Sequence, residues 1–576
     1  MSPESEPGEA VPEAIRPLRE ALTRAAREAG APDDFRPELE RPRNEEHGDW
    51  ATNAALVLGG RLDRPPREIA EGIAGSLDRE AAGVSEVDVA GPGFINFRLS
   101  DRLVWSELAE AVARDEEWGR QPDAGEGRVN VEFVSANPTG PLHVAHGRGA
   151  ALGDAVASLL EWTGHDVVRE FYVNDAGRQI ELLGESVDAR FLQARGRDTE
   201  VPEGGYRGDY VADLAERIAS EEGEERLADM EPGERSELFA DRAVEILRAE
   251  QERDLEEFGV RMDVFREESE LYESGAVDDA LEALDEVGLT YREEGAVWLR
   301  TSDFGDEKDR VLVKSDGEYT YFLPDIAYHV EKARRGFQRA IDVWGADHHG
   351  HVPRMEAALE ALGLPEEFLE TLLIQLVSVY RGDREVQMSK RAGEFVTLRE
   401  LFRETGPDVA RYFFLMRRAE VHLQFDLELA LDTSEANPVY KIQYAHARMC
   451  SVFEKGGVDA SGIEADVDLL ELLETDSERE VAKTVARFPE AVRDAARSRS
   501  PYRVCSYLEE LAGTVNAWYH EGNEDPTLRV LADVPARPAR LALARAVQVT
   551  LRNGLRLLGL TAPEQMIRED GGEEAA

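Results

Sequence analysis

The spacing of hydrophobic positions changes along this 576-residue chain. Residues 14–118 combine helical spacing with two alternating runs around the Gly-Pro-Gly turn at 91–93, which predicts a small α+β domain. Apolar runs at 129–134, 166–173 and 340–344 are separated by helical patterns, and this alternation predicts parallel strands. Beyond Thr397 the spacing is helical, which predicts an all-helical end.

These patterns predict an α/β protein of three domains. An N-terminal α+β domain spans 1–118, a Rossmann-type catalytic domain 119–430, and a helical domain 431–576. A very acidic helical stretch, at about 199–294, interrupts the catalytic domain as an insertion. Its carboxylates are more simply explained as a solvated face than as metal ligands.

The composition adds an unusual charge. The chain has 119 Asp and Glu against 67 Lys and Arg, a net charge of −52, and only seven of the cations are lysines. Because 42% of the residues are hydrophobic, this is not a disordered acidic chain. An acid-rich, lysine-poor surface is typical of a haloarchaeal-type cytoplasm of very high salt, where the Debye length is about 3 Å at ~1 M. The alternative is an acidic protein from a cytoplasm of ordinary salt concentration. At low salt, the negative charge disfavours binding of nucleic acid.

Two cysteines without a Cys-x-x-Cys pair give no basis for a disulfide framework or a cysteine zinc site. No apolar run approaches 18 residues. We therefore expect a cytoplasmic protein without membrane contact and without a structural metal.

The richest chemistry lies just after the first predicted strand of the catalytic domain. That strand leads into Asn137-Pro-Thr-Gly-Pro141, and a helix of small residues begins near His143. A strand, a tight turn and a helix N-terminus together form an anion-binding architecture. His143 and His146 are three residues apart and project from one face, while Gly147, Gly149 and Gly153 leave room for a flat ligand. For a lone His-x-x-His, the alternative is a structural βα unit.

Two other loops carry candidate chemistry. Gly345-Ala-Asp-His-His-Gly-His351 follows a predicted strand, at the end where open α/β sheets hold ligands. A metal is conceivable there, but nucleotide contact is the more economical interpretation. Lys390 lies in Met388-Ser-Lys-Arg391, and a loop with a cation and a hydroxyl suits a pyrophosphate leaving group.

The C-terminal helices contain a stretch without acids. Residues 534–563 have no Asp or Glu but contain Arg537, Arg540, Arg545, Arg552 and Arg556. Such a locally basic face is typical of RNA binding. The alternative is a buried helix pair whose arginines extend to the surface.

Together these motifs resemble a known family. His143-Val-Ala-His146 and Met388-Ser-Lys390, on either side of an inserted domain, resemble the signatures of class I aminoacyl-tRNA synthetases. The segments 131–143, 172–180, 345–351, 443–448 and 557–566 are similar, in this order, to those of arginyl-tRNA synthetases, and the resemblance covers residues 14–566.

The resemblance implies a fold and an activity. It implies a Rossmann-type class I catalytic domain with a helical insertion, an N-terminal tRNA-binding domain and a C-terminal anticodon-binding bundle. ATP and arginine then give arginyl-adenylate and pyrophosphate, and the arginyl group moves to the terminal adenosine of tRNA(Arg). Magnesium would accompany ATP, arginine activation would need bound tRNA, and we expect a monomer.

The resemblance also implies residue roles. The catalytic residues are His143, His146 and Lys390. A planar guanidinium favours a bidentate carboxylate, here Asp325 one helical turn after Tyr321. The other expected arginine contacts are Glu132, Ser135, Asn137 and His349. The expected ATP contacts are Pro141, His143, His146, Gly147, Gly345, Asp347, His348, Met388, Ser389 and Lys390. The expected tRNA contacts are Tyr444, Arg448, Trp518, Tyr519, Arg545, Arg552 and Met566.

Two positions depart from the family pattern. Ala145 replaces the usual glycine between the histidines, and Gln387 replaces the first lysine of the lysine loop.

Two rival functions remain. A class I synthetase for cysteine or glutamate is disfavoured by the lack of zinc-type cysteines and by Asp325. A tRNA-binding paralogue without catalysis is disfavoured by the intact histidines and Lys390.

Overall fold

The computed structural model describes residues 15–42, 44–122, 125, 127–386 and 396–566. The predicted lysine loop, with Gln387, Met388, Ser389 and Lys390, lies outside these residues. Among the residues that are described, no helix combines the length and the apolar composition needed to cross a bilayer.

A five-stranded, all-parallel sheet forms the centre of the molecule, as the apolar runs predict. Its order is β11 (Leu369–Ile374), β10 (Arg339–Gly345), β4 (Arg128–Glu132), β5 (Asp166–Val173) and β6 (Val264–Glu267). From β4 the chain adds β5 and β6 on one side, and from β10 it adds β11 on the other. The carboxyl ends of β4 and β10 therefore form the topological switch point, where such sheets bind ligands.

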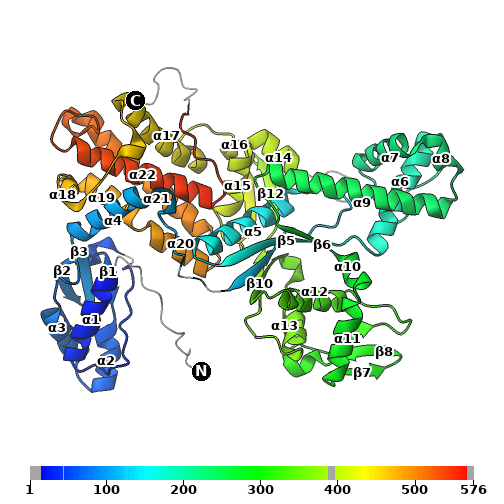
Figure 1. The fold of residues 1–576 in the computed structure, drawn as a ribbon, viewed down its shortest axis with the longest axis horizontal. Helices are drawn as coiled ribbons and strands as arrows, with labels where there is room; N and C mark the ends of the chain where they lie inside the picture. Colours follow the sequence, from blue (N-terminus) through cyan, green and yellow to red (C-terminus); the bar gives the residue numbers. More distant parts are fainter. Residues whose placement is uncertain (1–14, 43, 123–124, 126, 387–395, 567–576) are drawn as a thin grey trace.

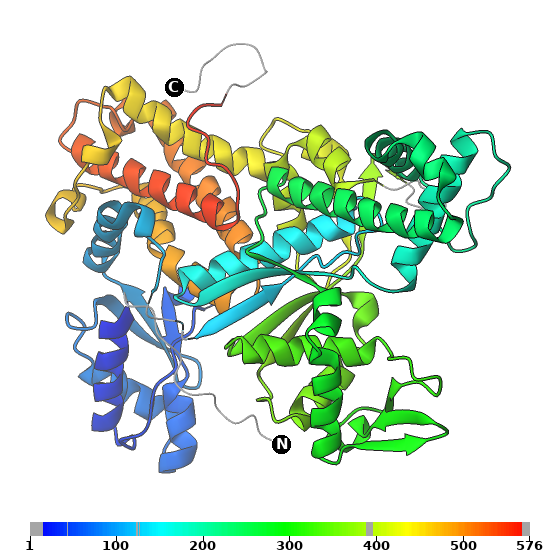
Figure 2. The same ribbon diagram turned by 45° about the vertical axis from the view of Figure 1, so that its right-hand side comes forward.

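Helices cover both faces of this sheet. Helix α5 (Val144–Trp162) lies on one face, and α12 (Phe322–Arg334) and α13 (Val352–Ala361) lie on the other (Figures 1 and 2). The outer side of α5 packs against α14 (Leu398–Thr405), α15 (Pro407–Leu415) and α20 (Phe488–Arg497). Most residues of α5 are buried, which explains why they are small and apolar.

The insertion is a helical arm with its own apolar core. It consists of α6 (Arg178–Ala194), α7 (Asp209–Glu222), α8 (Glu224–Asp229) and α9 (Pro232–Glu257), and it projects from the body in Figure 1. The structure draws its boundaries differently from the predicted 199–294. Helix α6 belongs to the arm because Leu183, Val187 and Phe191 join its core, whereas β6 belongs to the central sheet.

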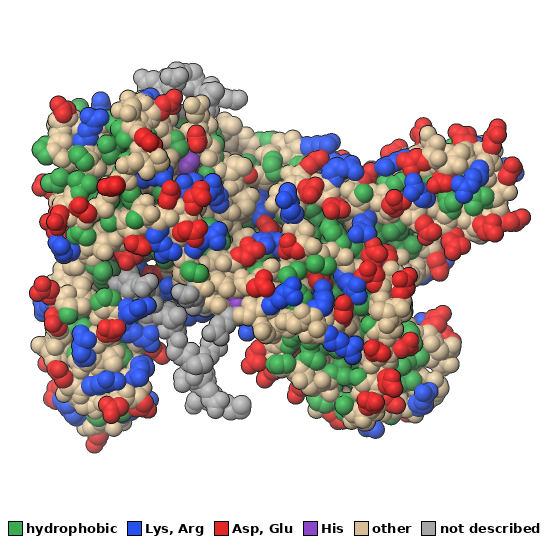
Figure 3. Space-filling model, in the orientation of Figure 1, with side chains coloured by type: hydrophobic (Ala, Val, Ile, Leu, Met, Phe, Trp, Pro, Cys, Tyr) green, Lys and Arg blue, Asp and Glu red, His purple; other side chains and the backbone are tan. Residues whose placement is uncertain are grey.

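A second small unit precedes α12. It contains two helices and an antiparallel sheet: α10 (Glu268–Glu273), α11 (Ala276–Glu286), β7 (Thr290–Glu293), β8 (Ala296–Leu299) and β9 (Arg310–Val313). Beyond β11 a further small sheet follows, made of β12 (Val377–Arg381), β13 (Arg384–Glu385) and β14 (Leu423–Asp426). Figure 3 shows acidic side chains spread over these units and, densely, over the arm.

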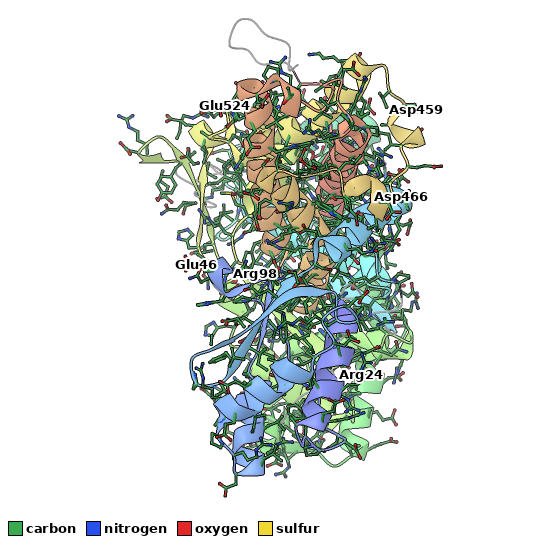
Figure 4. The ribbon with its side chains drawn as sticks, turned by 90° about the vertical axis from the view of Figure 1, so that its left-hand side faces the viewer. Arg24, Glu46, Arg98, Asp459, Asp466 and Glu524 are labelled. Atoms are coloured by element: carbon green, nitrogen blue, oxygen red, sulfur yellow. The ribbon has the colours of Figure 1, made fainter. Side chains whose placement is uncertain are left out.

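The N-terminal domain has the predicted α+β fold and a separate core. Its elements are α1 (Arg16–Glu28), β1 (Trp50–Thr52), α2 (Ala54–Leu62), α3 (Pro66–Ser76), β2 (Val84–Ala90) and β3 (Phe94–Leu99). In Figure 4 it lies below the C-terminal helices, with Arg24 on α1 and with Arg98 and Glu46 near the junction. Across that junction, the Arg41 guanidinium donates to both carboxylate oxygens of Glu490.

Helix α4 (Asp101–Arg114) differs from the predicted organisation. The sequence places it in the N-terminal domain, but Val104, Trp105 and Leu108 lie in the core shared with the C-terminal helices. Asp115, just after α4, accepts hydrogen bonds from Arg545 at 2.9 Å and from Arg552 at 2.5 Å. Helix α4 therefore belongs to the C-terminal bundle, beside which it lies in Figure 1.

The end of the chain is helical, as predicted. After α16 (Leu427–Ala430) come α17 (Pro438–Gly456), α18 (Val467–Leu470), α19 (Asp476–Ala486), α20, α21 (Tyr502–Glu524) and α22 (Arg537–Leu557). Asp459 and Asp466 lie in its connecting segments (Figure 4).

Candidate active site

The two histidines lie at the beginning of α5, beside the switch point. Their rings stack, with centroids 3.7 Å apart and planes 25° apart. The backbone N–H of His143 donates to Nδ1 of His146 at 3.2 Å. Because Nδ1 of His146 is an acceptor, the proton of its neutral ring lies on Nε2. The stacked pair and the helix N-terminus provide donors suited to a phosphate.

The segment after the predicted lysine loop is attached to this histidine signature. The backbone N–H of Leu398 donates to the carbonyl of Leu142 at 2.8 Å, and Thr397 forms a β-bridge with His143. Thr397 and Leu398 therefore lie beside the beginning of α5. The roles of Met388, Ser389 and Lys390 stay predictions.

The glycines of α5 serve packing within the protein. A Cβ at Gly147 would lie 2.6 Å from Leu398, and one at Gly153 would lie 2.1 Å from Phe133. At Gly149 the nearest atom would be Ile374 at 3.4 Å. The expected room for a flat ligand is thus occupied by neighbouring side chains at Gly147 and Gly153. The contact of Gly147 with ATP stays a prediction, and the packing of Gly147 against Leu398 is reason enough for a glycine at this position.

The residues after β4 adopt an unusual backbone. Val134 and Ser135 are successive non-glycine residues with positive φ, 71° and 38°, a conformation that costs about 1–3 kcal/mol per residue and is concentrated at functional sites. It directs Oγ of Ser135 to Oε1 of Glu132 at 2.8 Å, and the same Oγ accepts from the backbone N–H of Tyr172 at 3.1 Å. Asn137 follows in the turn and donates to Gln179 at 2.6 Å. The expected contacts for the α-amino end of arginine thus come from one loop.

The expected guanidinium site lies across the sheet, at the beginning of α12. Tyr321 is 67% exposed, and Asp325 follows one turn later. A histidine of the loop after β10 reaches Asp325, but it is not the expected one: Nε2 of His351 lies 3.1 Å from the carboxylate. His349 is exposed, and its Nδ1 lies 3.1 Å from the carbonyl of Ala346. In this loop the structure places His351, rather than His349, beside Asp325.

Glu268, the first residue of α10, is a site residue that the sequence did not single out. Burial, together with the charges of Asp325 and Asp175, raises the pKa of its carboxyl to about 7. Asp175 is held in place by the backbone N–H and the hydroxyl of Ser269, at 3.0 and 2.7 Å. A carboxyl group that repels its neighbours in this way favours binding of a cation. In the sequence, Glu268 is one of many acids in the predicted insertion. Its position directly after the short strand β6 is the feature that could have identified it as a site residue.

The remaining expected ATP residues lie at the end of β10, next to β4. Asp347 and His348 are exposed, with Nε2 of the histidine 3.8 Å from the carboxylate. A Cβ at Gly345 would lie 2.5 Å from Oδ1 of Asp347, so any larger residue there would displace this carboxylate. Pro141 is half-buried in the loop before α5. Within the described ranges, no three histidine, cysteine, aspartate or glutamate side chains are grouped as a metal ion would require.

Most of the expected tRNA contacts have structural partners. Trp518 and Tyr444 are buried in the bundle. The Arg448 guanidinium lies between the rings of Tyr444 and Tyr519, 4.6 and 4.5 Å from their centroids, and donates to Asn516. Met566 is half-buried at the end of the described chain.

Four of the five arginines of α22 pair with carboxylates from distant parts of the sequence. Arg545 and Arg552 bind Asp115, Arg556 lies 3.0 Å from Glu116, and Arg540 lies 2.6 Å from Glu478. The alternative of structural arginines therefore describes these pairs, and the tRNA roles of Arg545 and Arg552 stay predictions.

Comparisons with known proteins agree with this arrangement. Residues 107–419 match the family model of the class I tRNA synthetase (R) catalytic domain, 16–99 the arginyl-tRNA synthetase N-terminal domain, and 442–566 the DALR anticodon-binding domain. Helix α4 begins after the end of the N-terminal match, and most of it falls within the catalytic-domain match.

Full-length relatives and a solved structure support the same assignment. The chain is 46% identical to the arginine–tRNA ligase of Geobacillus kaustophilus, over 95% of this chain and 98% of the relative. It is 45% identical to that of Bacillus subtilis, over 92% and 94%. The Thermus thermophilus arginyl-tRNA synthetase structure superposes with a TM-score of 0.73 at 27% identity and covers 96% of this chain and 100% of its own. The chain belongs to the arginyl-tRNA synthetase family of class I aminoacyl-tRNA synthetases.

Proposed function

We propose that this protein is an arginine–tRNA ligase of protein biosynthesis, which forms arginyl-adenylate from ATP and arginine and transfers the arginyl group to tRNA(Arg). The observation that carries the proposal is the group of carboxylates, Asp325 and Glu268, at the same sheet edge as the stacked histidines. A guanidinium is the cation that two carboxylates bind best, because its planar array of donors meets both.

The proposed reaction needs no covalent nucleophile. ATP, accompanied by Mg²⁺, would place its phosphates at the N-terminus of α5, beside His143 and His146, and Lys390 would assist from the lysine loop. The carboxylate of arginine attacks the α-phosphate, and pyrophosphate leaves. The donors of the histidine pair stabilise the charge that develops on the phosphate oxygens.

We propose that arginine is held at both ends. Its α-ammonium group meets Glu132, with Ser135 and Asn137 beside it, and its guanidinium meets Asp325 and Glu268, with Tyr321 over it. Gly345, Asp347 and His348 face the adenosine. The resemblance implies His349 as an arginine contact, and this proposal uses His351 instead because it is the histidine that lies beside Asp325.

The raised pKa of Glu268 predicts a pH dependence. In the free protein this carboxyl has a pKa of about 7, and a bound guanidinium lowers it, so arginine binds the ionised form more tightly. We expect the KM for arginine to rise about tenfold between pH 8 and pH 6, with little change in the KM for ATP.

Steady-state arginylation kinetics at both pH values measure this effect. Glu268→Gln should have a raised KM for arginine that no longer varies over this range. Glu273→Gln, at the exposed end of the same helix, serves as the control and should keep the wild-type profile. An unchanged profile in Glu268→Gln would assign the dependence to another group.

Charging of total tRNA with tritiated arginine tests the proposed function. We expect arginine to be attached and other amino acids to be rejected. Charging with a different amino acid would point to another class I synthetase, and charging with none would favour a tRNA-binding paralogue.

We also propose that the enzyme acts as a cytoplasmic monomer and needs high salt. The support for the salt requirement is the net charge of −52. The relatives compared above are bacterial, so they give no support to an archaeal origin. Charging assays from 0.1 M to ~3 M KCl, where exposed charges are screened, test this point.

We further propose that arginine activation needs bound tRNA, with Tyr519, Arg448, Arg552 and Met566 as candidate contacts.

A further inference from the structure

A buried cluster of charges lies beneath the arginine site, between α12 and the strands β4 and β10. Lys332 is 0% exposed, and its Nζ donates to Oε2 of Glu132 at 2.6 Å and to Oδ1 of Asp342 at 2.8 Å. Asp342 is also 0% exposed, and its other oxygen lies 2.8 Å from Nε2 of His329. The mechanism proposed above uses neither Lys332 nor Asp342 nor His329.

Helix α12 connects this cluster to the guanidinium site. Asp325, His329 and Lys332 are spaced i, i+4 and i+7, so they form one stripe along the helix. Nδ1 of His329 lies 2.7 Å from the carbonyl of Asp325. Both ring nitrogens of His329 thus face oxygen atoms, Nδ1 the carbonyl of Asp325 and Nε2 the carboxylate of Asp342. The same stripe therefore supports Asp325 at one end and the carboxylate of Glu132 at the other.

Lys332 provides the positive charge next to two buried carboxylates. Burial raises the pKa of Glu132, Lys332 opposes this, and Asp342 adds to it. Burial by itself would lower the pKa of Lys332, but Asp342 and Glu132 outweigh burial and raise it. Without this ammonium group, Glu132 and Asp342 would repel each other, and one of them would take up a proton.

The surrounding charges do not replace Lys332. The titratable or charged groups that face the pair are His329 and Tyr328 from α12, Asp342 from β10, and Glu170 and Tyr172 from β5. Glu170 is already paired with Arg335, which donates to both of its oxygens at 2.7 Å. Lys332 is the cation that donates directly to Glu132.

We propose that Lys332 is a positioning residue that keeps Glu132 ionised and oriented for the α-ammonium group of arginine. The inference rests on the proposed role of Glu132. Ser135 occupies one lone pair of Oε1 and Lys332 one of Oε2. Each oxygen keeps a second lone pair, so the carboxylate can still accept hydrogen bonds from a bound ammonium group.

A substrate analogue separates this role from a general structural one. Argininic acid has a hydroxyl in place of the α-amino group, so it lacks the charge that Glu132 would bind, and it should compete with arginine through its guanidinium. For Lys332→Met, we expect the arginine KM to rise about tenfold or more, since a buried charge pair loses one partner. The inhibition constant of argininic acid and the KM for ATP should stay within about twofold, because neither depends on an ionised Glu132.

Lys314→Met is the control variant, because Lys314 forms an exposed pair with Glu318 instead of a buried one. It should leave all three constants unchanged. If Lys332→Met weakens argininic acid as much as arginine, the variant distorts the whole site and the proposal is overturned.

A second comparison decides the matter even if Lys332→Met fails to fold. Glu132→Gln and the double variant Glu132→Gln/Lys332→Met should have the same arginine KM, because Lys332 acts through a carboxylate that both lack. The double variant also removes one negative and one positive charge together. A further loss of tenfold in the double variant would refute the proposal. If the wild-type protein charges no tRNA with arginine, the proposed function fails instead.

Discussion

Replacing Asp325 by Asn raises the KM for arginine by about 100-fold or more, while the KM for ATP changes little. Removing one partner of a buried or half-buried charge pair costs about 2–5 kcal/mol, and the amide cannot offer two anionic oxygens to a guanidinium. The proposed ATP site uses other segments, at the N-terminus of α5 and the end of β10, so we expect no contact between the nucleotide and this carboxylate. Arginylation kinetics with each substrate varied in turn measure both constants.

Two features of this experiment make it specific. Asp303→Asn, an exposed aspartate in the connection between β8 and β9, is the matched control and should behave as the wild type. Equal increases in both KM values for Asp325→Asn would contradict the guanidinium role and indicate a distorted site. Glu268→Gln should also raise the KM for arginine more than the KM for ATP, because Glu268 and Asp325 belong to the same group of carboxylates.

Replacing His146 by Ala lowers kcat for arginine activation by about 10²–10³-fold, because one preorganised donor to the developing phosphate charge is lost. We expect the KM values to change by much less, since the side chain acts mainly in the transition state. Single-turnover formation of arginyl-adenylate on the tRNA-bound enzyme measures the chemical step directly.

The control for this variant is His520→Ala, an exposed histidine of α21. Losing the hydrogen bond between His143 and His146 also weakens the beginning of α5 by about 1 kcal/mol. A comparison of Tm values shows whether the variant remains folded. A variant with normal kcat and a raised KM for ATP would assign His146 to ground-state binding.

The sequence predicts the elements whose signals are local. The apolar run before Glu132, the Pro/Gly turn and the small-residue helix beginning at His143 each depend on neighbouring residues, and the structure shows the expected β4–α5 unit. Both candidate loops follow predicted parallel strands, whose carboxyl ends meet at one edge of a sheet. This is why the histidine loop and the loop after Gly345 are correctly expected at one edge.

Other features depend on contacts between distant residues. The pattern of an amphipathic helix shows that it buries one face, but not which core that face joins, so the sequence places α4 and α6 with other neighbours than the structure does. The acid-free stretch of α22 looked basic because its partner, Asp115, is far away in the sequence. Glu268 was one glutamate among many, and only its burial distinguishes it. His349 and His351 differ by the direction of a short turn, which spacing does not determine.

The position of α4 determines when the C-terminal bundle can form during synthesis. This helix leaves the ribosome early, but its apolar face packs against α19 and α22, which are made near the end. The bundle core therefore depends on contacts of long sequence separation, which form slowly because the intervening chain must first be ordered. Until α22 is released, Trp105 and Leu108 have no core to enter, and nascent chains are most prone to aggregate in that interval.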